Sequence, residues 1–373
     1  MKRKLKIGVI FGGRSAEHEV SLVSAQSVIN ALDKKKYDII PIGITLSGRW
    51  ISSNNAIKIL KNRKKLENNN EKILIPDPNI KGLVTLFSKK LKIEKIDVVF
   101  PVLHGTFGED GTLQGLLELA DIPYVGAGVL ASAVAMDKIT AHKLLKFSKI
   151  PVVEKIWFLY RNFITQKKSI LQNIEKKLGY PCFIKPSKLG SSVGITKAHN
   201  RKELVNGIEL ASKYDTKILI EKAVKKAREI EVSVLGNHQP IVSIPGEVIP
   251  SNEFYDYDAK YVDGKSKIEI PAKLPNKIIK KIQHYAIMGY QALDCSGMAR
   301  VDFLVEKDTL KIYLNELNTI PGFTSISMYP KLWEASGLPY SKLLDKLIEL
   351  SIERYNEKKK LKTIYKPKAE WYK

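Results

Sequence analysis

Strands and helices alternate over the first third of the chain, and this order restricts the folds that the chain can adopt. A strand pattern at 5–11 ends in two glycines and is followed by a helical pattern at 20–32. Further strand patterns cover 38–46 and 96–103, and a glycine-rich turn leads from the second of these into a helix at 113–119. Strand–helix–strand order predicts a parallel sheet with helices on both faces. Such sheets bind ligands at the carboxyl ends of their strands.

The pattern changes after Gly128, where the sequence predicts an α+β arrangement with antiparallel hairpins. A helix that contains Met136, Asp137 and Lys138 is expected to run to about residue 148. The strands expected after this helix cover 181–185, 192–197, 218–221 and 229–235.

A hairpin is predicted near the C-terminus, with strands at 299–306 and 310–317. Side chains alternate between the two faces of a strand, so polar residues two positions apart share a face. Barring a bulge, a connecting loop with an odd number of residues places the polar faces of both strands on the same side. The residues concerned are Arg300 and Asp302 on the first strand and Glu316 and Asn318 on the second.

This polar face of the hairpin has the chemistry of a metal–nucleotide site. Carboxylate and amide oxygens are hard ligands that suit Mg²⁺, which bridges to substrate phosphates. Arg300 would interact with the negative charge of a transferring phosphoryl group. The loop at 319–325 follows directly and offers backbone N–H groups and hydroxyls. The alternative is a solvated face with incidental ion pairs.

A glycine- and serine-rich segment at 185–194 follows an apolar strand. Glycines let the backbone approach an anion, successive N–H groups can surround a phosphate, and Lys185 adds a point charge. The segment lacks the Gly-Lys-Ser/Thr ending of a P-loop, and a plain hairpin turn is the alternative. Together with Lys138 and the metal-type residues, it is interpreted as a phosphate-binding loop.

Two further segments have features of a nucleotide site. The strand end at 221–224 offers an acceptor side chain and backbone groups for adenine, and Glu229 offers a carboxylate for a ribose. The polar, aromatic segment at 255–261 has the composition of a mobile loop that closes over a site and excludes water. An exposed edge strand and a surface loop without function are the alternatives.

The net charge of +23 and the pI near 9.6 are typical of proteins that bind nucleic acid. The lysines and arginines, however, fall in short scattered clusters, without a known nucleic-acid module or a basic stripe interleaved with aromatics. We interpret the charge as a lysine-rich, solvent-exposed surface and expect no nucleic-acid partner. Residues 52–92, rich in lysine and asparagine, are interpreted as a variable surface segment.

No apolar run approaches the roughly 18 residues that span a bilayer, and no membrane association is expected. The basic start of the chain precedes an apolar run that is too short for a signal peptide. The two cysteines, Cys182 and Cys295, have no spacing typical of a disulfide framework or a metal site. A cytoplasmic location is therefore expected. Cys182 lies in an apolar strand pattern, which favours core packing over a nucleophilic role.

Six segments, taken in their order, make the chain resemble the D-alanine–D-alanine ligases of the ATP-grasp superfamily, from its first strand to about residue 355. The segments are 12–21, 104–115, 136–138, 185–194, 260–261 and 300–327. The resemblance implies an ATP-grasp fold with an N-terminal, Rossmann-like parallel-sheet domain, and three domains in total. These are a substrate-binding α/β domain at 1–125, a central subdomain with the phosphate loop at 126–220, and a C-terminal subdomain with the metal site and the closing loop at 221–373.

The resemblance also implies the joining of two D-alanine molecules to D-alanyl-D-alanine, with ATP converted to ADP and phosphate, for peptidoglycan synthesis. The carboxylate of the first D-alanine would attack the γ-phosphate to form an acyl phosphate. The amine of the second would then attack the activated carbonyl through a tetrahedral intermediate. Positioning and electrostatics carry a phosphoryl transfer of this kind. The implied cofactors are ATP and two Mg²⁺ or Mn²⁺ ions, and the implied assembly is a homodimer.

For the two D-alanine sites, the resemblance implies roles for residues from all three domains. Glu17 would bind the ammonium group of the first D-alanine, with Ser191 and Tyr261 hydrogen-bonded to Glu17. His104 would lie near the same substrate. A helix-start carboxylate and a capping histidine at a strand end are the alternatives for Glu17 and His104. The residues implied at the oxyanion and at the second carboxylate are Arg300, the Gly322 N–H group and Ser327.

For ATP and the metal ions, the resemblance implies a second set of residues. Those at ATP are Lys138, Lys185 and Lys260 for the phosphates, Glu221 with the backbone of Lys222 and Val224 for adenine, Glu229 for the ribose, and Ser192 of the glycine-rich loop. Those at the metal ions are Asp302, Glu316 and Asn318, with Glu316 bridging.

Two other functions stay open at this stage. Related ligases that make D-alanyl-D-lactate lack the tyrosine of the closing loop, and some D-serine ligases carry phenylalanine there, so Tyr261 favours the dipeptide. A catalytically silent, basic nucleic-acid-binding protein on the same scaffold is the other alternative. The complete set of metal-type and phosphate-type residues argues against it. The tail at 357–373 extends beyond the usual end of the family and could alter assembly.

Overall fold

The first sheet is formed by the N-terminal third of the chain, in a computed structural model that describes residues 3–62, 71–87, 90–190, 193–249, 267–365 and 367. Its central strand pairs in parallel with a neighbour on each side, and a short antiparallel strand lies at one edge. The predicted parallel sheet is therefore confirmed. Its order is β3 (Trp50–Ser52), β2 (Tyr37–Ile44), β1 (Leu5–Gly12) and β7 (Val98–Pro101).

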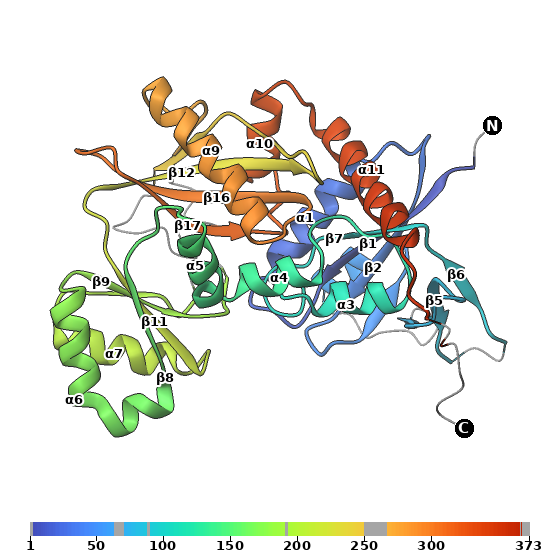
Figure 1. The fold of residues 1–373 in the computed structure, drawn as a ribbon. Coiled ribbons are helices and arrows are strands. Elements are labelled where there is room, and N and C mark those ends of the chain that lie inside the picture. Colours follow the sequence, from blue (N-terminus) through green and yellow to red (C-terminus); the bar gives the residue numbers. More distant parts are fainter. Residues whose placement is uncertain are drawn as a thin grey trace.

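Helices cover both faces of this sheet, as the alternating pattern predicts. Odd-numbered residues of β1, such as Ile7 and Val9, pack with α1 (His18–Ala31) and with the distant C-terminal helix α11 (Tyr340–Lys359). Ile10 faces the other way and packs with α3 (Thr112–Leu119). Figure 1 shows α11 lying against the N-terminal part of the molecule, so the two ends of the described chain share one core.

Residues within 52–92, together with the following 93–95, form more regular structure than the sequence pattern indicates. The helix α2 (Ala56–Lys61) packs beside β2. Beyond it, three short strands form an antiparallel sheet at the side of the N-terminal domain. They are β4 (Lys72–Leu74), β5 (Gly82–Thr85) and β6 (Ile93–Lys95). Strands of three or four residues give too short an alternation to be recognised in a lysine-rich sequence.

The predicted helix through Asp137 is wrong in one respect, because the structure contains two helices, α4 (Val129–Met136) and α5 (Lys138–Phe147). Asp137 lies between them with extended backbone angles, and its Oδ1 accepts hydrogen bonds from the N–H groups of Ile139 and Thr140. An aspartate that caps the first turn of a helix satisfies N–H groups that otherwise lack partners. The break places Lys138 at the start of α5.

The second sheet is antiparallel, and two helices cover one of its faces. Even-numbered residues, including Cys182 and Ile184, pack against α6 (Tyr160–Lys177) and α7 (Arg201–Ala211). Burial raises the pKa of the Cys182 thiol to about 11, which suits the predicted packing role and not a nucleophile. The odd-numbered residues point to the opposite face. The order is β10 (Thr196–Ala198), β9 (Cys182–Pro186), β11 (Lys217–Lys222) and β8 (Lys155–Leu159).

The third sheet is also antiparallel, as predicted for this half of the chain, and α9 (Asn276–Ala292) covers one of its faces. The helix α10 (Met328–Ala335) follows its last strand and packs beside β12. The order is β15 (Lys267–Glu269), β14 (Gly246–Ile249), β12 (Ala227–Gly236), β16 (Gly297–Glu306) and β17 (Ile312–Asn318), and β13 (Ile241–Val242) also pairs with β12.

The hairpin of β16 and β17 reaches its predicted geometry through a bulge, the exception that the argument from loop length had set aside. Val305 pairs with Ile312, and this register, if continued, would set Asp302 opposite Asn315. A shift between Asp302 and Phe303 instead sets Asp302 opposite Glu316 and Arg300 opposite Asn318. The extra residue is a β-bulge, which turns the following side chains to the other face. The polar residues therefore share a face because of the bulge and not because of the loop length.

Arg354 of α11 connects the N-terminal sheet to the third sheet. Its Nη2 donates to the Tyr124 carbonyl oxygen (2.9 Å), and its Nη1 donates to Ser296 Oγ (2.7 Å) and to the Gly126 carbonyl oxygen. The guanidinium also lies 4.5 Å from the centre of the Tyr124 ring. Charge-assisted hydrogen bonds of this kind are stronger than neutral ones.

We predict that Arg354→Ala lowers the free energy of unfolding by about 2–3 kcal/mol, because it leaves partly buried carbonyl groups without their donor. Urea unfolding followed by circular dichroism measures the loss. Arg161→Ala, at an exposed position of α6, is the matched control and should change stability by less than about 0.5 kcal/mol. Equal stability of both variants would contradict the connecting role of Arg354.

Candidate functional site

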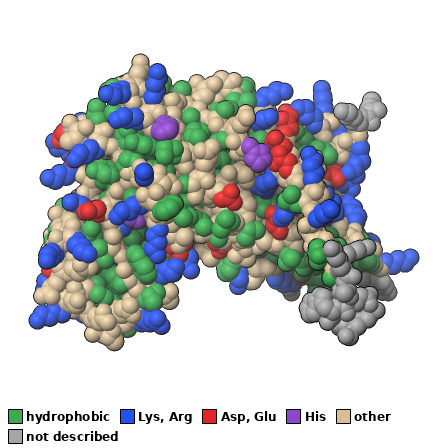
Figure 2. Space-filling model, viewed as in Figure 1, with side chains coloured by type: hydrophobic (Ala, Val, Ile, Leu, Met, Phe, Trp, Pro, Cys, Tyr) green, Lys and Arg blue, Asp and Glu red, His purple; other side chains and the backbone are tan. Residues whose placement is uncertain are grey.

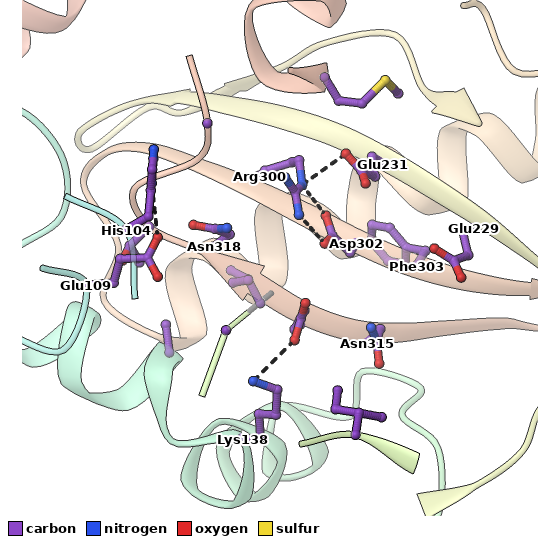
Figure 3. Close-up of a pocket in the computed structure, with 18 of the residues that line it drawn as sticks. His104, Glu109, Lys138, Glu229, Glu231, Arg300, Asp302, Phe303, Asn315 and Asn318 are labelled. Carbon is purple, nitrogen blue, oxygen red and sulfur yellow. Dashed lines mark hydrogen bonds and ion pairs between the residues drawn. The ribbon is translucent and has the colours of Figure 1, made fainter. Parts of the chain in front are cut away.

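Two polar sheet faces meet across one pocket. The face of the second sheet that lacks α6 and α7 carries Lys185 and Glu221, and the face of the third sheet opposite α9 carries Arg300 and Asp302. The N-terminal domain closes the remaining side with Glu17, as the lining of the pocket shows. Figure 3 shows the third-sheet wall, with Lys138 approaching from α5. Ligands of this pocket would therefore contact all three parts of the chain.

Arg300 is held by two carboxylates on the third-sheet wall. Its Nε and Nη2 each donate to an oxygen of Asp302 at 2.7 Å, and its Nε lies 3.0 Å from Glu231 Oε2 (Figure 3). Burial disfavours the charge, but the two carboxylates outweigh burial and hold the pKa of Arg300 well above its ordinary value. The planar guanidinium is thus fixed in orientation, and its Nη1 takes part in neither bond to Asp302.

The oxygen donors beside Arg300 fit a hard divalent cation. The bulged register places the carboxylates of Asp302 and Glu316 opposite one another, and Asn318 lies opposite Arg300 on the same face. Asn318 Oδ1 accepts a hydrogen bond from the Ile320 N–H group at 3.2 Å, which orients the amide oxygen. Within the described ranges, no three His, Cys, Asp or Glu side chains form a metal-type group by themselves. The fit thus needs the amide of Asn318 as the third donor.

Lys138 approaches this wall from the start of α5. Its Nζ lies 3.6 Å from Glu316 Oε2 and donates to the Leu189 carbonyl oxygen at 2.8 Å. The preceding Asp137 fixes this position, since its carboxylate also accepts from Ser187 Oγ (3.0 Å) and Lys217 Nζ (2.7 Å). The lysine at the start of α5 and the segment after β9 are therefore held together.

Lys185 and Glu221 form a buried ion pair on the second-sheet wall. Lys185 Nζ lies 3.0 Å from Glu221 Oε2, and Lys155 Nζ lies 3.3 Å from the same oxygen. Burial would raise the pKa of Glu221, but the two lysines outweigh burial and lower it to about 2. The Glu221 carboxylate is thus engaged by lysines.

Glu17 lies where the N-terminal domain meets the glycine-rich loop. A side chain at Gly105 or Gly190 would place its Cβ 2.5 or 2.8 Å from Glu17 Oε2. Both positions therefore need glycine for the carboxylate to occupy this place. Glu17 is 8% exposed and lines the pocket, where a carboxylate can bind a substrate ammonium group.

His104 links the N-terminal domain to the loop after β17. Its Nδ1 lies 3.2 Å from the Ile320 carbonyl oxygen, which can only accept, so Nδ1 is the donor. Its Nε2 lies 3.1 Å from Ser24 Oγ, and Glu109 Oε1 lies 3.7 Å from Nδ1. Burial lowers the pKa of His104, but Glu109 outweighs burial and raises it above the ordinary value. Figure 3 shows the His104–Glu109 pair at one end of the pocket.

The loop after β17 is compact and fixed at both ends. Ser327 Oγ accepts from the Thr324 N–H group (3.0 Å) and lies 2.8 Å from Thr324 Oγ1. Gly322 packs so closely on this hydroxyl that a Cβ would lie 2.6 Å from Ser327 Oγ. Gly322, Thr324 and Ser327 all line the pocket. The loop therefore presents backbone and hydroxyl groups beside Arg300.

The structure brings together every predicted site residue that it describes. Ser191, Ser192, Lys260 and Tyr261 lie outside the described residues. The others line the pocket: Glu17, His104, Lys138, Lys185, Glu221, Lys222, Val224, Glu229, Arg300, Asp302, Glu316, Asn318, Gly322 and Ser327. Their individual roles remain predictions.

Three charged residues at the site were missed in the sequence. Glu231 pairs with Arg300, Glu109 lies beside His104, and Lys155 contacts Glu221. Glu231 follows Glu229 at a two-residue spacing, so strand alternation could have placed it on the same face. Glu109 lies within 104–115, one of the six segments that carry the family resemblance. Lys155 has no signal in the sequence, because its contact joins distant strands.

The surface charge and the helices can be compared with two partners considered from the sequence, nucleic acid and membranes. Figure 2 shows lysines and arginines scattered over the visible face among apolar and acidic side chains. This distribution agrees with the interpretation of the net charge as a lysine-rich, solvent-exposed surface. In the part of the chain that the structure describes, no helix is long and apolar enough to cross a bilayer.

Comparison with known families gives a match over most of the chain. The model described as the D-ala D-ala ligase N-terminus matches residues 6–127, and that of the D-ala D-ala ligase C-terminus matches residues 144–349. The chain belongs to the D-alanine–D-alanine ligase family. The family resemblance stated from the sequence is thereby confirmed.

Relatives and solved structures of this family cover nearly the whole chain. The D-alanine–D-alanine ligase of Clostridium acetobutylicum is 54% identical over 95% of this chain and 99% of its own, and that of Chloroherpeton thalassium is 52% identical over 95% and 98%. The D-alanine–D-alanine ligase structure from Coxiella burnetii is 38% identical, with a TM-score of 0.83 over 96% of this chain and 98% of its own. The VanG D-Ala:D-Ser ligase of Enterococcus faecalis is 43% identical, with a TM-score of 0.83 over 94% and 100%. The ATP-grasp fold predicted from the sequence is confirmed by these likenesses.

We predict that Glu221→Gln destabilises the protein in a pH-dependent way. The pKa of Glu221 falls from 4.5 to about 2 on folding, so the ionised carboxylate contributes about 3 kcal/mol above pH 4.5. This contribution is lost as the pH falls from 4.5 towards 2. The difference in the free energy of unfolding between wild type and variant should therefore narrow by about 2 kcal/mol between pH 7 and pH 3. Urea unfolding at several pH values measures the gap. Glu154→Gln, at an exposed neighbouring position, is the control. A gap that does not change with pH would contradict the prediction.

Proposed function

We propose that this protein joins two D-alanine molecules into D-alanyl-D-alanine, with conversion of ATP to ADP and phosphate, for the synthesis of peptidoglycan precursors. The observation that carries the proposal is the meeting of two charged walls over one pocket. Lys138 and Lys185 lie on one side, and Arg300, Asp302 and Glu316 lie on the other. Family membership and the names of the relatives support the same reaction.

ATP would lie along the second-sheet wall. Lys138 and Lys185 supply positive charge for the phosphates, and the glycine-rich loop supplies N–H groups. The backbone of Lys222 and Val224 at the end of β11 would contact adenine, and the Glu229 carboxylate would bind the ribose hydroxyls. In this assignment Glu221 holds the lysines and contacts the nucleotide through its backbone.

Two Mg²⁺ or Mn²⁺ ions would be held by Asp302, Glu316 and Asn318, with Glu316 bridging. The donor chemistry fits, and the bulge places these side chains on one face. When bound, such ions neutralise negative charge that develops on the phosphate oxygens.

In the first half of the reaction, the protein has to hold an amino acid carboxylate against the γ-phosphate. Glu17 would bind the ammonium group of the first D-alanine and so direct its carboxylate towards the phosphates beside Lys138 and Lys185. The attack forms an acyl phosphate and releases ADP. Correct placement of two reactants is the main source of rate in such a step. His104, whose Nδ1 bonds the Ile320 carbonyl oxygen, would fix the loop at the same subsite.

In the second half, the amine of the second D-alanine attacks the acyl carbonyl, and phosphate leaves. The tetrahedral intermediate carries a negative oxygen, which Arg300 and the Gly322 N–H group would stabilise. Asp302 and Glu231 fix the guanidinium before the reaction begins, so little reorganisation is needed. Ser327 would bind the carboxylate of the second D-alanine. The predicted lock of Glu17 by Ser191 and Tyr261, with Lys260 and Ser192 at the phosphates, belongs to the same proposal.

D-serine as the second substrate is the alternative with a specific observation in its favour. The VanG ligase, named for D-Ala and D-Ser, has the same TM-score as the Coxiella ligase and a higher identity to this chain. The relatives at 52–54% identity, however, are named D-alanine–D-alanine ligases. Tyr261 also favours the dipeptide of alanine. A homodimer, as the family resemblance implies, and a cytoplasmic location are part of the proposal.

Phosphate release with different amino acids tests the proposed reaction. We expect D-alanine alone, with ATP and Mg²⁺ at near-neutral pH, to support full turnover. Adding D-serine or D-lactate should not increase the rate. Little turnover with D-alanine alone would refute the proposal, and turnover only with D-serine would establish the alternative.

We predict that Glu316→Gln abolishes turnover, with a loss of at least about 100-fold in kcat, because the amide removes a charge from the proposed metal site. The fold should be intact, as judged by circular dichroism and thermal unfolding. Glu306→Gln, on the same hairpin but outside the pocket, should keep wild-type kcat. Wild-type kcat in Glu316→Gln would refute the metal role.

A further inference from the structure

A lysine that does not line the pocket contacts the buried carboxylate of the second-sheet wall. Lys155 is the first residue of β8 and lies opposite Glu221 of β11 in the strand register. Its side chain is 4% exposed, and its Nζ lies 3.3 Å from Glu221 Oε2. Lys185 Nζ lies 3.0 Å from the same oxygen. One carboxylate oxygen is therefore shared between two ammonium groups.

The three charges of this cluster do not cancel. Two lysines and one glutamate leave a net charge of +1 in a buried position. Lys185 and Glu221 line the pocket, whereas Lys155 lies outside it, in a neighbouring hollow with His142, Trp157 and Leu219. The excess positive charge thus lies on the same sheet face as the phosphates of a nucleotide would, at the edge of the pocket.

Stability alone does not account for Lys155. Burial lowers the pKa of Lys155, although Glu221 opposes the change, so the ammonium is disfavoured at this place. Replacing a buried ion pair by apolar side chains is often neutral or stabilising. An apolar residue on β8 would also leave Glu221 to pair with Lys185 alone. A buried excess of positive charge is instead relieved when an anion binds beside it.

We propose that Lys155 is a positioning residue for ATP. By sharing the Glu221 carboxylate, Lys155 prevents that carboxylate from neutralising Lys185, and the Lys185 ammonium stays available to the polyphosphate. The inference rests on the proposed function, since it takes ATP as the ligand of the pocket. Lys155 acts through Glu221 and Lys185, so its effect depends on the phosphates of the ligand and not on its adenosine part.

Binding of ATP to the full-length protein, measured by isothermal titration calorimetry, tests the proposal. Lys155→Met should raise the Kd for ATP about tenfold, while the affinity for adenosine, measured by competition with ATP, should not change. Lys155→Arg should keep wild-type affinity for ATP, because the charge is kept. Unchanged adenosine binding also shows that the variant is folded. Lys143→Met is the matched control, since Lys143 lies in the same hollow, with its ammonium over the Trp157 ring, 4.7 Å from the ring centre.

A double substitution tests whether the effect passes through Glu221. In a Glu221→Gln background the carboxylate that the two lysines share is absent, so Lys155→Met should weaken ATP binding much less than tenfold. The same loss in both backgrounds would overturn the proposal. Wild-type affinity for ATP in Lys155→Met, or an equal loss for ATP and adenosine, would also overturn it. Wild-type protein that binds no ATP would overturn the proposed function itself, which is a distinct result.

Discussion

The register of β17 against β16 is the constraint on which the rest of the site depends. Without the bulge, Glu316 would lie opposite Val301, whose side chain packs into the core under α9. A one-residue slip in a strand moves every later side chain to the other face. The bulge therefore decides whether the Glu316 carboxylate and the Asn318 amide face the pocket beside Arg300 and Asp302, or face the core. The pairing of β12 with β16 adds Glu229 and Glu231 to the same face.

Buried charges at the site form two small groups of ion pairs, one on the third sheet and one on the second. Arg300 is shared by Asp302 and Glu231, while Glu221 is shared by Lys155 and Lys185. A buried charge without a partner would cost several kcal/mol, so removal of any one member exposes the others to that penalty. The groups lie on different sheets, and the pocket separates them. A metal-bound polyphosphate complements this arrangement, because its phosphates are negative and its metal ions are positive.

The sequence predicted the parallel sheet, the antiparallel hairpins and most of the pocket, and the misses have physical causes. The parallel sheet followed from strand–helix order, and the pocket residues came from motifs within continuous segments. The bulge at Asn315 was not foreseen, because Asn315 fits a regular strand pattern as well as a bulge. The break at Asp137 was hidden by apolar residues on both sides of it. Lys155 could not be found, since its contact with Glu221 depends on which strands pair in the folded sheet.

The two proposed oxyanion donors belong to different elements, and one of these elements is held by the N-terminal domain. The geometry of the proposed oxyanion site therefore depends on contacts between distant parts of the chain. Arg300 belongs to β16 of the third sheet. Gly322 belongs to the loop after β17, and the N-terminal domain fixes that loop through His104 Nδ1 on the Ile320 carbonyl oxygen and Ser24 Oγ on the Phe323 N–H group. The contact between the domains therefore contributes to the distance between the donors, together with the pairing of β17 on β16 and the contacts within the loop. Docking of the first sheet on the third thus supports the placement of the Gly322 N–H group beside Arg300.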